Sequence, residues 1–243
     1  MAAQAEQYSQ ISQHQEKDGL NLIDKVCIVK GSKVLDLGCG TGYLSSVLAG
    51  LVGPQGRVIG VDPDKDRIQV ATEKYSSENI VFMEGSSDNF PADQYDLVFS
   101  NYVLHWIKDK KSAFYNIYQS LRSGGRFAFH DALELAKLHS QLINLMDPSR
   151  VRDMYDMLFF ETCEVYEKLA KQSGFSVEYK DTTELKVVFP SIEFYIDWMC
   201  ATTHGVFDPA MIDKAILESF SKSYEGKPVD CIIPCLSMIL VKP

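Results

Sequence analysis

The stretch Val34-Leu-Asp-Leu-Gly-Cys-Gly-Thr-Gly42 ends a short apolar run and places three glycines within five residues. Eight of the fifteen glycines lie between positions 31 and 60. Glycines concentrated after a strand let the backbone approach a ligand closely, because no Cβ intervenes. A dinucleotide-binding G-x-G-x-x-G fingerprint needs a third glycine at position 43, where this chain has Tyr43. Asp36 would also repel a pyrophosphate, so the loop suits a cationic ligand better.

Short apolar runs alternate with helical patterns around this loop, from position 33 to about position 132. The runs are rich in β-branched and aromatic residues, as strands buried on both faces are. The segments between them carry apolar residues at helical spacing. This alternation predicts βαβ units around a parallel sheet. The predicted strands are 33–38, 57–62, 80–84, 95–100 and 125–130, and the predicted helices between them include 64–75 and 112–121.

The regular alternation ends after position 132. Asp147-Pro148 interrupts one helical pattern, and Gly174 supplies a stop for the next. A helical block rich in aromatic residues and methionine precedes the last apolar run. We therefore expect helices over 134–146 and 149–172, paired strands over 176–189 with a turn near 181–182, a helical block over 191–224, and a last strand over 236–241.

Charge and cysteine content exclude several classes of function. The formal net charge is −9 with a pI near 5.1, so the chain lacks the positive field that attracts nucleic acid. No apolar run approaches the roughly 18 residues of a membrane span, and the N-terminus lacks a signal-peptide pattern. We therefore expect a cytoplasmic protein that does not bind membranes. The six cysteines form no C-x-x-C pair, which predicts reduced thiols and no metal site.

Several ordered motifs resemble those of the class I S-adenosylmethionine-dependent methyltransferases. Residues 34–42 resemble motif I, Asp62 follows Asp36 by 26 residues, and Gly85-Ser-Ser87 lies where that family contacts adenine. Residues 95–101 resemble motif II, and 121–126 resemble the turn before strand five. The resemblance implies S-adenosylmethionine as cofactor. It also implies a Rossmann-like, doubly wound α/β fold, with a mostly parallel seven-stranded sheet, helices on both faces and a helical cap inserted before the last strand.

Length and composition permit one methyltransferase domain over residues 1–243. Within it the patterns distinguish an N-terminal helical cap segment (1–30), a cofactor-binding core (31–132), a completion of that core (133–190), a helical substrate lid (191–224) and a terminal strand (225–243). The oligomeric state is left open, with a monomer preferred.

The resemblance also implies which residues contact the cofactor. Asp36 and the glycine loop would hold its methionine part, and Asp62 would accept hydrogen bonds from both ribose hydroxyls. Asn101 would contact it near the reacting methyl group through its backbone carbonyl. Ser86 departs from the family, because many members have Asp there. The implied contacts are Asp36, Gly38, Cys39, Gly40, Asp62, Pro63, Ser86, Ser87 and Asn101.

The methyl acceptor is less well defined by the sequence. His105 and His130 lie near strand ends, where a base or a hydrogen-bond donor would meet a ligand, although a packed histidine is as common there. The Tyr-Val-Leu-His-Trp-Ile run from Tyr102 resembles juvenile hormone acid and trans-aconitate methyltransferases, which methylate carboxylic acids. We therefore expect O-methylation of a small carboxylic acid, with His105 as the candidate catalytic residue. Candidate substrate contacts are Tyr8, Gln15, Tyr102, Trp106, His130 and Trp198.

Three other functions stay open. An amine or phenol acceptor has to lose a proton, which would make His105 a base. The chain could also bind S-adenosylmethionine without catalysis, as a partner protein. Arsenic methylation would need thiols that converge on the methyl group, and Cys163 and Cys200 are the best-placed candidates.

Overall fold

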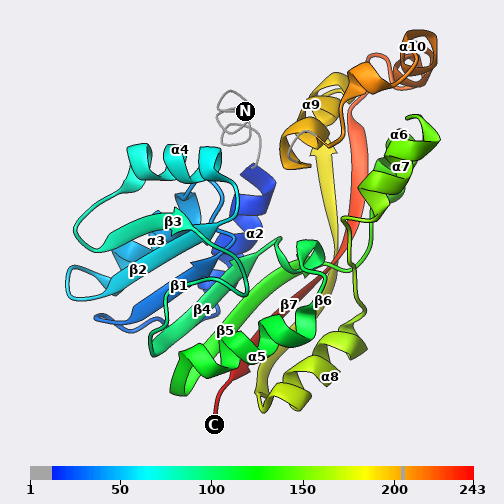
Figure 1. The fold of residues 1–243 in the computed structure, drawn as a ribbon. Helices are drawn as coiled ribbons and strands as arrows, with labels where there is room; N and C mark the ends of the chain where they lie inside the picture. The colour runs from blue at the N-terminus through cyan, green and yellow to red at the C-terminus, as the bar shows by residue number, and fades with distance from the viewer. Residues whose placement is uncertain (1–12, 204–205) are drawn as a thin grey trace.

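The computed structural model describes residues 13–203 and 206–243, whose arrangement Figure 1 shows. A seven-stranded sheet runs through the molecule in the order β3-β2-β1-β4-β5-β7-β6. Strands β1 to β5 pair in parallel, whereas β7 is antiparallel to both β5 and β6. The predicted fold is therefore confirmed. The strands are β1 (Lys33–Leu37), β2 (Arg57–Asp62), β3 (Ile80–Glu84), β4 (Tyr95–Asn101), β5 (Leu121–Ala132), β6 (Ser176–Phe189) and β7 (Val229–Val241).

Helices cover both faces of the sheet because successive strand residues point to opposite sides. Val34 packs in an apolar cluster with α2, α3 and α4, whereas Leu35 packs in a cluster with α5 and α8 on the other face. Both side chains are fully buried. These helices are α2 (Gln13–Ile23), α3 (Tyr43–Val52), α4 (Lys65–Tyr75), α5 (Lys110–Ser120) and α8 (Cys163–Ser173).

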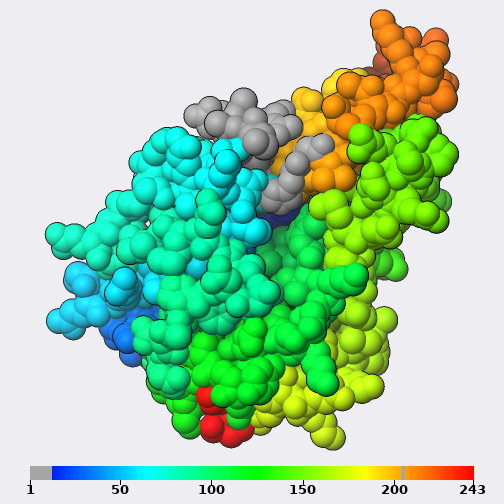
Figure 2. Space-filling model, viewed as in Figure 1, coloured from blue at the N-terminus to red at the C-terminus, as the bar shows by residue number. Residues whose placement is uncertain are grey.

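The last two strands extend beyond the rest of the sheet. Pairing of β5 with β7 ends at Ala132 and Cys235, but β6 and β7 stay paired as far as Phe189 and Val229. We call residues 184–189 and 229–234 the β6–β7 extension. An apolar cluster joins it to α6 (Lys137–Ile143), α7 (Pro148–Tyr155) and α9 (Ile192–Thr202). With η2 (Pro209–Met211) and α10 (Lys214–Lys222), these helices form a cap that projects from the core (Figures 1 and 2).

The helix predicted over 149–172 is wrong, because the chain forms α7 and α8 with a non-helical segment between them. Tertiary hydrogen bonds hold that segment against the turn after β4. The Phe159 amide donates to the His105 carbonyl at 2.7 Å, and the Lys110 ammonium donates to the Phe159 carbonyl. A backbone bonded to a distant turn cannot complete a helical ladder.

The strand pair predicted over 176–189 is also wrong. Residues 181–182 lie inside one continuous strand, β6, whose partner is β7. The last strand accordingly starts at Val229 rather than at 236, and the helical block over 191–224 consists of α9, η2 and α10. The helix expected over 134–146 is present as the shorter α6. A single 3₁₀ turn, η1 (Leu104–Trp106), follows β4.

Candidate functional site

The glycine loop between β1 and α3 is folded as a tight cradle. The amides of Gly38 and Cys39 both donate to the Val61 carbonyl, at 2.8 and 3.0 Å. Gly38 has a φ of 76°, and a Cβ there would lie 2.1 Å from the Val103 side chain. Gly42, with a φ of 89°, is the N-cap of α3. Only glycine meets both demands at position 38, the backbone conformation and the close approach.

Two buried carboxylates flank this loop. Asp36, at 2% exposure, accepts a hydrogen bond from the Ser45 hydroxyl at 2.5 Å, and burial raises its pKa to about 7. Asp62, at the end of β2, accepts from the Gly40 amide at 3.0 Å and from the Asp64 amide at 2.9 Å. Each Asp62 oxygen keeps a second lone pair, since a carboxylate has about four acceptor positions.

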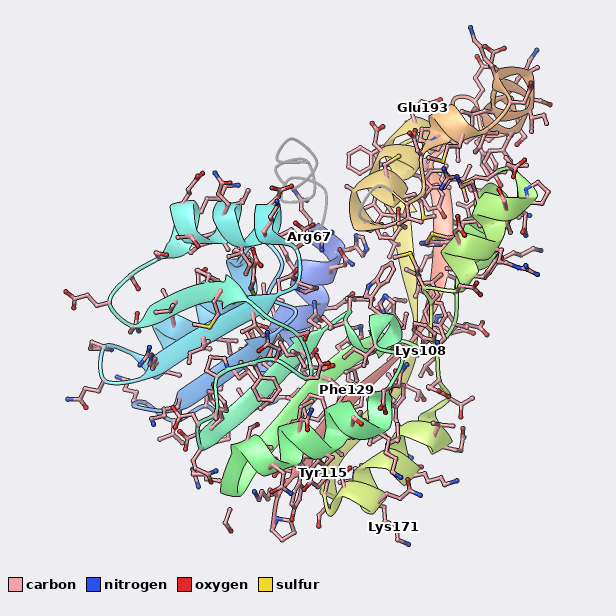
Figure 3. All side chains as sticks on the ribbon, viewed as in Figure 1. Arg67, Lys108, Tyr115, Phe129, Lys171 and Glu193 are labelled. Carbon is pink, nitrogen blue, oxygen red and sulfur yellow. The ribbon has the colours of Figure 1, made fainter. Side chains whose placement is uncertain are left out.

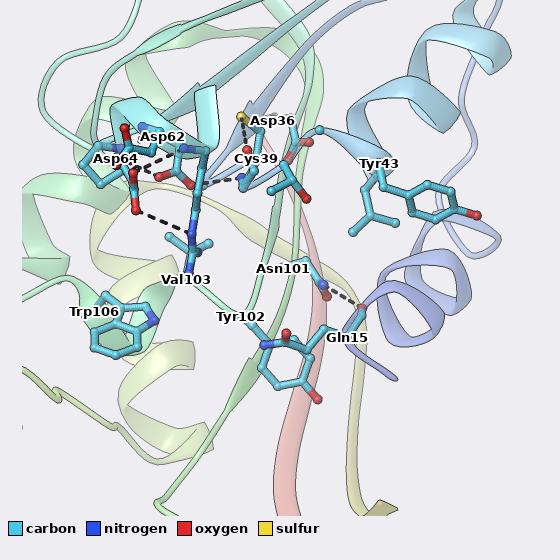
Figure 4. Close-up of a pocket in the computed structure, with 18 of the residues that line it drawn as sticks. Gln15, Asp36, Cys39, Tyr43, Asp62, Asp64, Asn101, Tyr102, Val103 and Trp106 are labelled. Carbon is cyan, nitrogen blue, oxygen red and sulfur yellow. Dashed lines mark hydrogen bonds and ion pairs between the residues drawn. The ribbon is translucent and has the colours of Figure 1, made fainter. Parts of the chain in front are cut away.

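A cavity of about 780 Å³ opens over the loop and both carboxylates (Figure 4). Its volume lies in the range of small-molecule and cofactor sites. Burial raises the pKa of the Cys39 thiol well above its ordinary value, which disfavours the nucleophilic thiolate form of this wall cysteine. Seven of the nine implied cofactor contacts line the cavity: Asp36, Gly38, Cys39, Gly40, Asp62, Pro63 and Asn101. The other two, Ser86 and Ser87, are not among its lining residues.

The amide side chains of Gln15 and Asn101 lie at the wall of the same cavity. Asn101 Nδ2 donates to the Gln15 carbonyl at 2.9 Å, which attaches α2 to the end of β4. Gln15 Oε1 and Asn101 Oδ1 are buried acceptors without a hydrogen-bond partner. Asn101 lines only this cavity, and an ammonium group would satisfy its Oδ1, so the residue fits the amino-acid end of S-adenosylmethionine. The side chain of Asn101, rather than only its backbone, thus belongs to the site.

Tyr102 is the one non-glycine residue of the described chain with a positive φ, 58°. Its hydroxyl donates to Asp18 at 2.9 Å, which gives α2 a second attachment to β4. Its ring packs edge-on against His130, 4.9 Å between centroids. His130 lines neither cavity described here. Its Nδ1 is 2.8 Å from the Ser237 hydroxyl, and burial lowers its pKa to about 4, so His130 is a neutral, buried support for Tyr102, and its contact with substrate stays a prediction.

A second, smaller cavity of about 90 Å³ lies between the core and the cap. It shares Gln15, Arg67, Tyr102 and Trp106 with the large cavity, so the two spaces adjoin. Four predicted residues line it besides His105: Gln15, Tyr102, Trp106 and Trp198. Tyr8 lies outside the described residues.

His105 belongs to a buried hydrogen-bonded chain of three side chains. Its Nδ1 is 2.6 Å from Asp131 Oδ1, and Asp131 Oδ2 accepts from the Tyr166 hydroxyl at 3.0 Å. Asp131 is fully buried. The His105 ring stacks on Phe160, 5.3 Å between centroids and 11° between planes. The sequence interpretation missed Asp131 and Tyr166, as well as His14 and His139, which also line the small cavity.

The described residues contain neither a cluster suited to a metal ion nor a membrane-spanning helix. No group of three or more His, Cys, Asp or Glu side chains among them is placed to hold a metal ion. Within the same residues no helix is long and apolar enough to cross a membrane.

Comparison with known proteins identifies the family. A family model described as "Methyltransferase domain" matches residues 28–184. An uncharacterized methyltransferase of Schizosaccharomyces pombe is 30% identical over 65% of this chain and 65% of its own length. The arsenite methyltransferase of Halobacterium salinarum is 31% identical over 69% of this chain and 42% of its own length. The chain thus spans about four tenths to two thirds of these relatives.

A solved structure shares the fold. Phosphoethanolamine N-methyltransferase 2 of Haemonchus contortus, in complex with S-adenosyl-L-methionine, superposes with a TM-score of 0.66 at 18% identity, covering 100% of this chain and 57% of that one. The family match and the glycine cradle with its two carboxylates together establish which family the chain belongs to. The chain belongs to the methyltransferase-domain family, the class I S-adenosylmethionine-dependent methyltransferases.

Proposed function

We propose that this chain transfers a methyl group from S-adenosylmethionine to a small acceptor molecule whose nucleophilic atom must lose a proton, with His105 as the base. The observation that carries the proposal is the 2.6 Å contact between His105 Nδ1 and the buried carboxylate of Asp131. A carboxylate only accepts hydrogen bonds, so Nδ1 carries the proton and Nε2 is left to accept one.

The surroundings of His105 favour the imidazole tautomer with its proton on Nδ1 and hold the ring in place. Burial raises the pKa of Tyr166, so its hydroxyl stays protonated and donates to Asp131. The stacked Phe160 ring and the hydrogen bond from the Phe159 amide hold the imidazole plane and its backbone. A base oriented by a third group is the arrangement that proton removal in a transition state requires.

The two cavities give the reactants adjoining positions. The bound cofactor supplies an electrophilic methyl group on a sulfonium, which a nucleophile displaces in line. In our proposal Asp36, Asp62 and Asn101 hold the cofactor in the large cavity. The acceptor occupies the small cavity, and helix α9 of the cap forms part of its wall through Trp198 and Met199. The cap then serves as the substrate lid and excludes water.

The carboxylic acid acceptor expected from the sequence stays a prediction. A carboxylate is already ionised at neutral pH and needs no base, so the Asp131–His105 pair would have no proton to remove from it. Arsenite methylation, the activity named for one relative, is not supported either. Among the residues lining the two cavities the one cysteine is Cys39, whose thiol is held protonated.

A pH profile of kcat tests the proposal. Purified protein and S-adenosylmethionine would be assayed with a panel of small amines, phenols and carboxylic acids. For an accepted amine or phenol, His105→Asn should lower kcat by a factor on the order of 10² to 10⁴, and the wild-type rate should rise with pH, because only an unprotonated imidazole can take the proton. Asp131→Asn should also lower kcat, because it removes the acceptor that orients the ring.

His130→Asn is the matched control, since it changes a buried imidazole on β5 that lines neither cavity. It should leave the pH dependence unchanged. Preferred turnover of a carboxylic acid, with a flat pH profile and appreciable activity in His105→Asn, would refute the base assignment. Cofactor binding without turnover of any acceptor would favour a non-catalytic partner protein.

A further inference from the structure

Polar atoms without partners gather around the small cavity. Among the described residues six buried side-chain nitrogen or oxygen atoms lack a hydrogen-bond partner, and three of the six belong to residues that line this cavity. They are His14 Nε2, Gln15 Oε1 and Trp198 Nε1. A buried polar atom left unpaired destabilises the folded state. Three at one cavity indicate a ligand that supplies the missing partners.

Few charged residues line this cavity. Of its lining residues, Arg67 and Glu134 are the ones that carry a permanent charge. Arg67, on α4 (Figure 3), donates to the Ala201 carbonyl at 3.0 Å and lies 3.7 Å from the Asp64 carboxylate. Burial lowers the pKa of His14 to about 4 and that of His139 to about 3, so both imidazoles are neutral at neutral pH. Apart from Arg67 and Glu134, the wall therefore presents dipoles rather than charges.

The indole of Trp198 is held rigidly. The centroid of its ring lies 5.1 Å from the centroid of the His14 ring and 5.2 Å from that of the His139 ring, and the planes of the Trp198 and His139 rings make an angle of 84°. Trp198 is 4% exposed, and its Nε1–H can only donate. Gln15 Oε1 can only accept. A ligand that satisfies both must combine an acceptor oxygen with an N–H or O–H donor.

The volume limits the size of that ligand group. A dry cavity of about 150 Å³ in another protein holds a benzene ring. At about 90 Å³ the small cavity is suited to a group of fewer atoms than benzene. A primary amide has the required size, an acceptor oxygen, two donors and no charge.

We propose that the small cavity binds the acceptor molecule through an uncharged amide group, whose carbonyl oxygen accepts from Trp198 Nε1–H and whose N–H donates to Gln15 Oε1. The proposal rests on the proposed function only in naming this ligand the methyl acceptor. It predicts that the site discriminates against a carboxylate of the same shape, which has no N–H and carries a charge.

Acetamide and acetate, which have the same number of heavy atoms, are suitable probes. The chain has two tryptophans, Trp106 and Trp198, and both line the small cavity, so their ¹⁵N-labelled indole N–H signals report on it directly. The protein saturated with S-adenosylhomocysteine would be titrated with each probe. We expect acetamide to shift the Trp198 signal at a concentration at least about tenfold lower than acetate, since one or two hydrogen bonds differ.

Two variants assign the effect. Trp198→Phe identifies the indole signal and should weaken the acetamide response at Trp106 by about fivefold, the loss of one neutral hydrogen bond. Gln15→Met keeps the backbone carbonyl that Asn101 contacts and should weaken acetamide binding by about fivefold, the loss of one neutral hydrogen bond. This second variant decides the question if Trp198→Phe does not fold.

Acetate acting at the same or a lower concentration, with its effect lost in Arg67→Gln, would show carboxylate binding and overturn the proposal. Absence of any acetamide shift would also overturn it. Because the titration needs no turnover, its result is independent of the His105 assays. A positive titration with no methyl transfer would refute the proposed function and leave the amide site standing.

Discussion

Replacing Asp36 by Asn should stabilise the free protein at neutral and alkaline pH. Asp36 is buried beneath the cofactor cavity and accepts a hydrogen bond from Ser45. Within the described chain it forms no ion pair with a cation, and Asp62 adds a second negative charge. Burial raises its pKa from 3.8 to about 7. The native state therefore binds the Asp36 proton more tightly than the unfolded chain does between these two pH values.

The sign and size follow from this shift. Because the native state holds more protons, the free energy of unfolding contributed by Asp36 falls as pH rises from about 4 to about 7. Three pKa units correspond to about 4 kcal/mol. Asn cannot ionise, so the stability difference between Asp36→Asn and wild type should be near zero at pH 4 and reach about 4 kcal/mol at pH 8. For a chain of this length that is a rise in Tm of about 10 °C.

Thermal and urea unfolding at several pH values would measure this difference. Asp93→Asn is a matched control with the opposite sign, because Lys33 holds the pKa of Asp93 below its ordinary value and its contribution is lost as pH falls. Asp36→Asn should also weaken S-adenosylmethionine binding, more at pH 8 than at pH 6, because the ionised carboxylate is what attracts the cation. A pH-independent stability difference, or a destabilised variant at pH 8, would refute the reasoning.

Two further substitutions test the cofactor cradle. Gly38→Ala should lose about 1–3 kcal/mol more stability than Gly31→Ala, because both glycines have a positive φ but only a Cβ at position 38 meets Val103. Denaturant unfolding measures both losses, and a Gly38→Ala loss that Val103→Ala does not relieve would contradict this reason. Asp62→Ala should weaken S-adenosylmethionine binding in calorimetry by a few kcal/mol, at roughly 1.5–3 kcal/mol per charge-assisted hydrogen bond, and unchanged affinity would remove Asp62 from the site.

The cofactor cradle could be predicted from the sequence because its determinants are local. Asp36, Gly38 and Asp62 lie at strand ends, and the carboxyl ends of parallel strands meet at one edge of the sheet. His105 was predicted for the same reason. Its partners Asp131 and Tyr166 could not be, since they come from β5 and α8, and nothing in a local pattern states which helix packs behind a given strand.

The errors in secondary structure have the same origin. The segment between α7 and α8 has helical periodicity, but its backbone is bonded to the turn after β4. Strand β6 alternates in polarity like a hairpin arm, and its continuity depends on partner residues that come forty or more positions later in the chain. Propensity yields to such long-range pairing because tertiary packing supplies most of the stability of an element.

The β6–β7 extension determines how the cap can move mechanically. A cap joined to its core by flexible loops can rotate about them as a hinge. Here two paired strands pass without interruption from the core into the cap. Any movement of the cap must therefore bend these strands and strain the continuous ladder of hydrogen bonds between them. The opposite side is joined by the contact of Arg67 with the Ala201 carbonyl, which can part without breaking secondary structure. Exchange of acceptor and product would then proceed by flexing at that seam, and its rate would depend on the stiffness of the two strands.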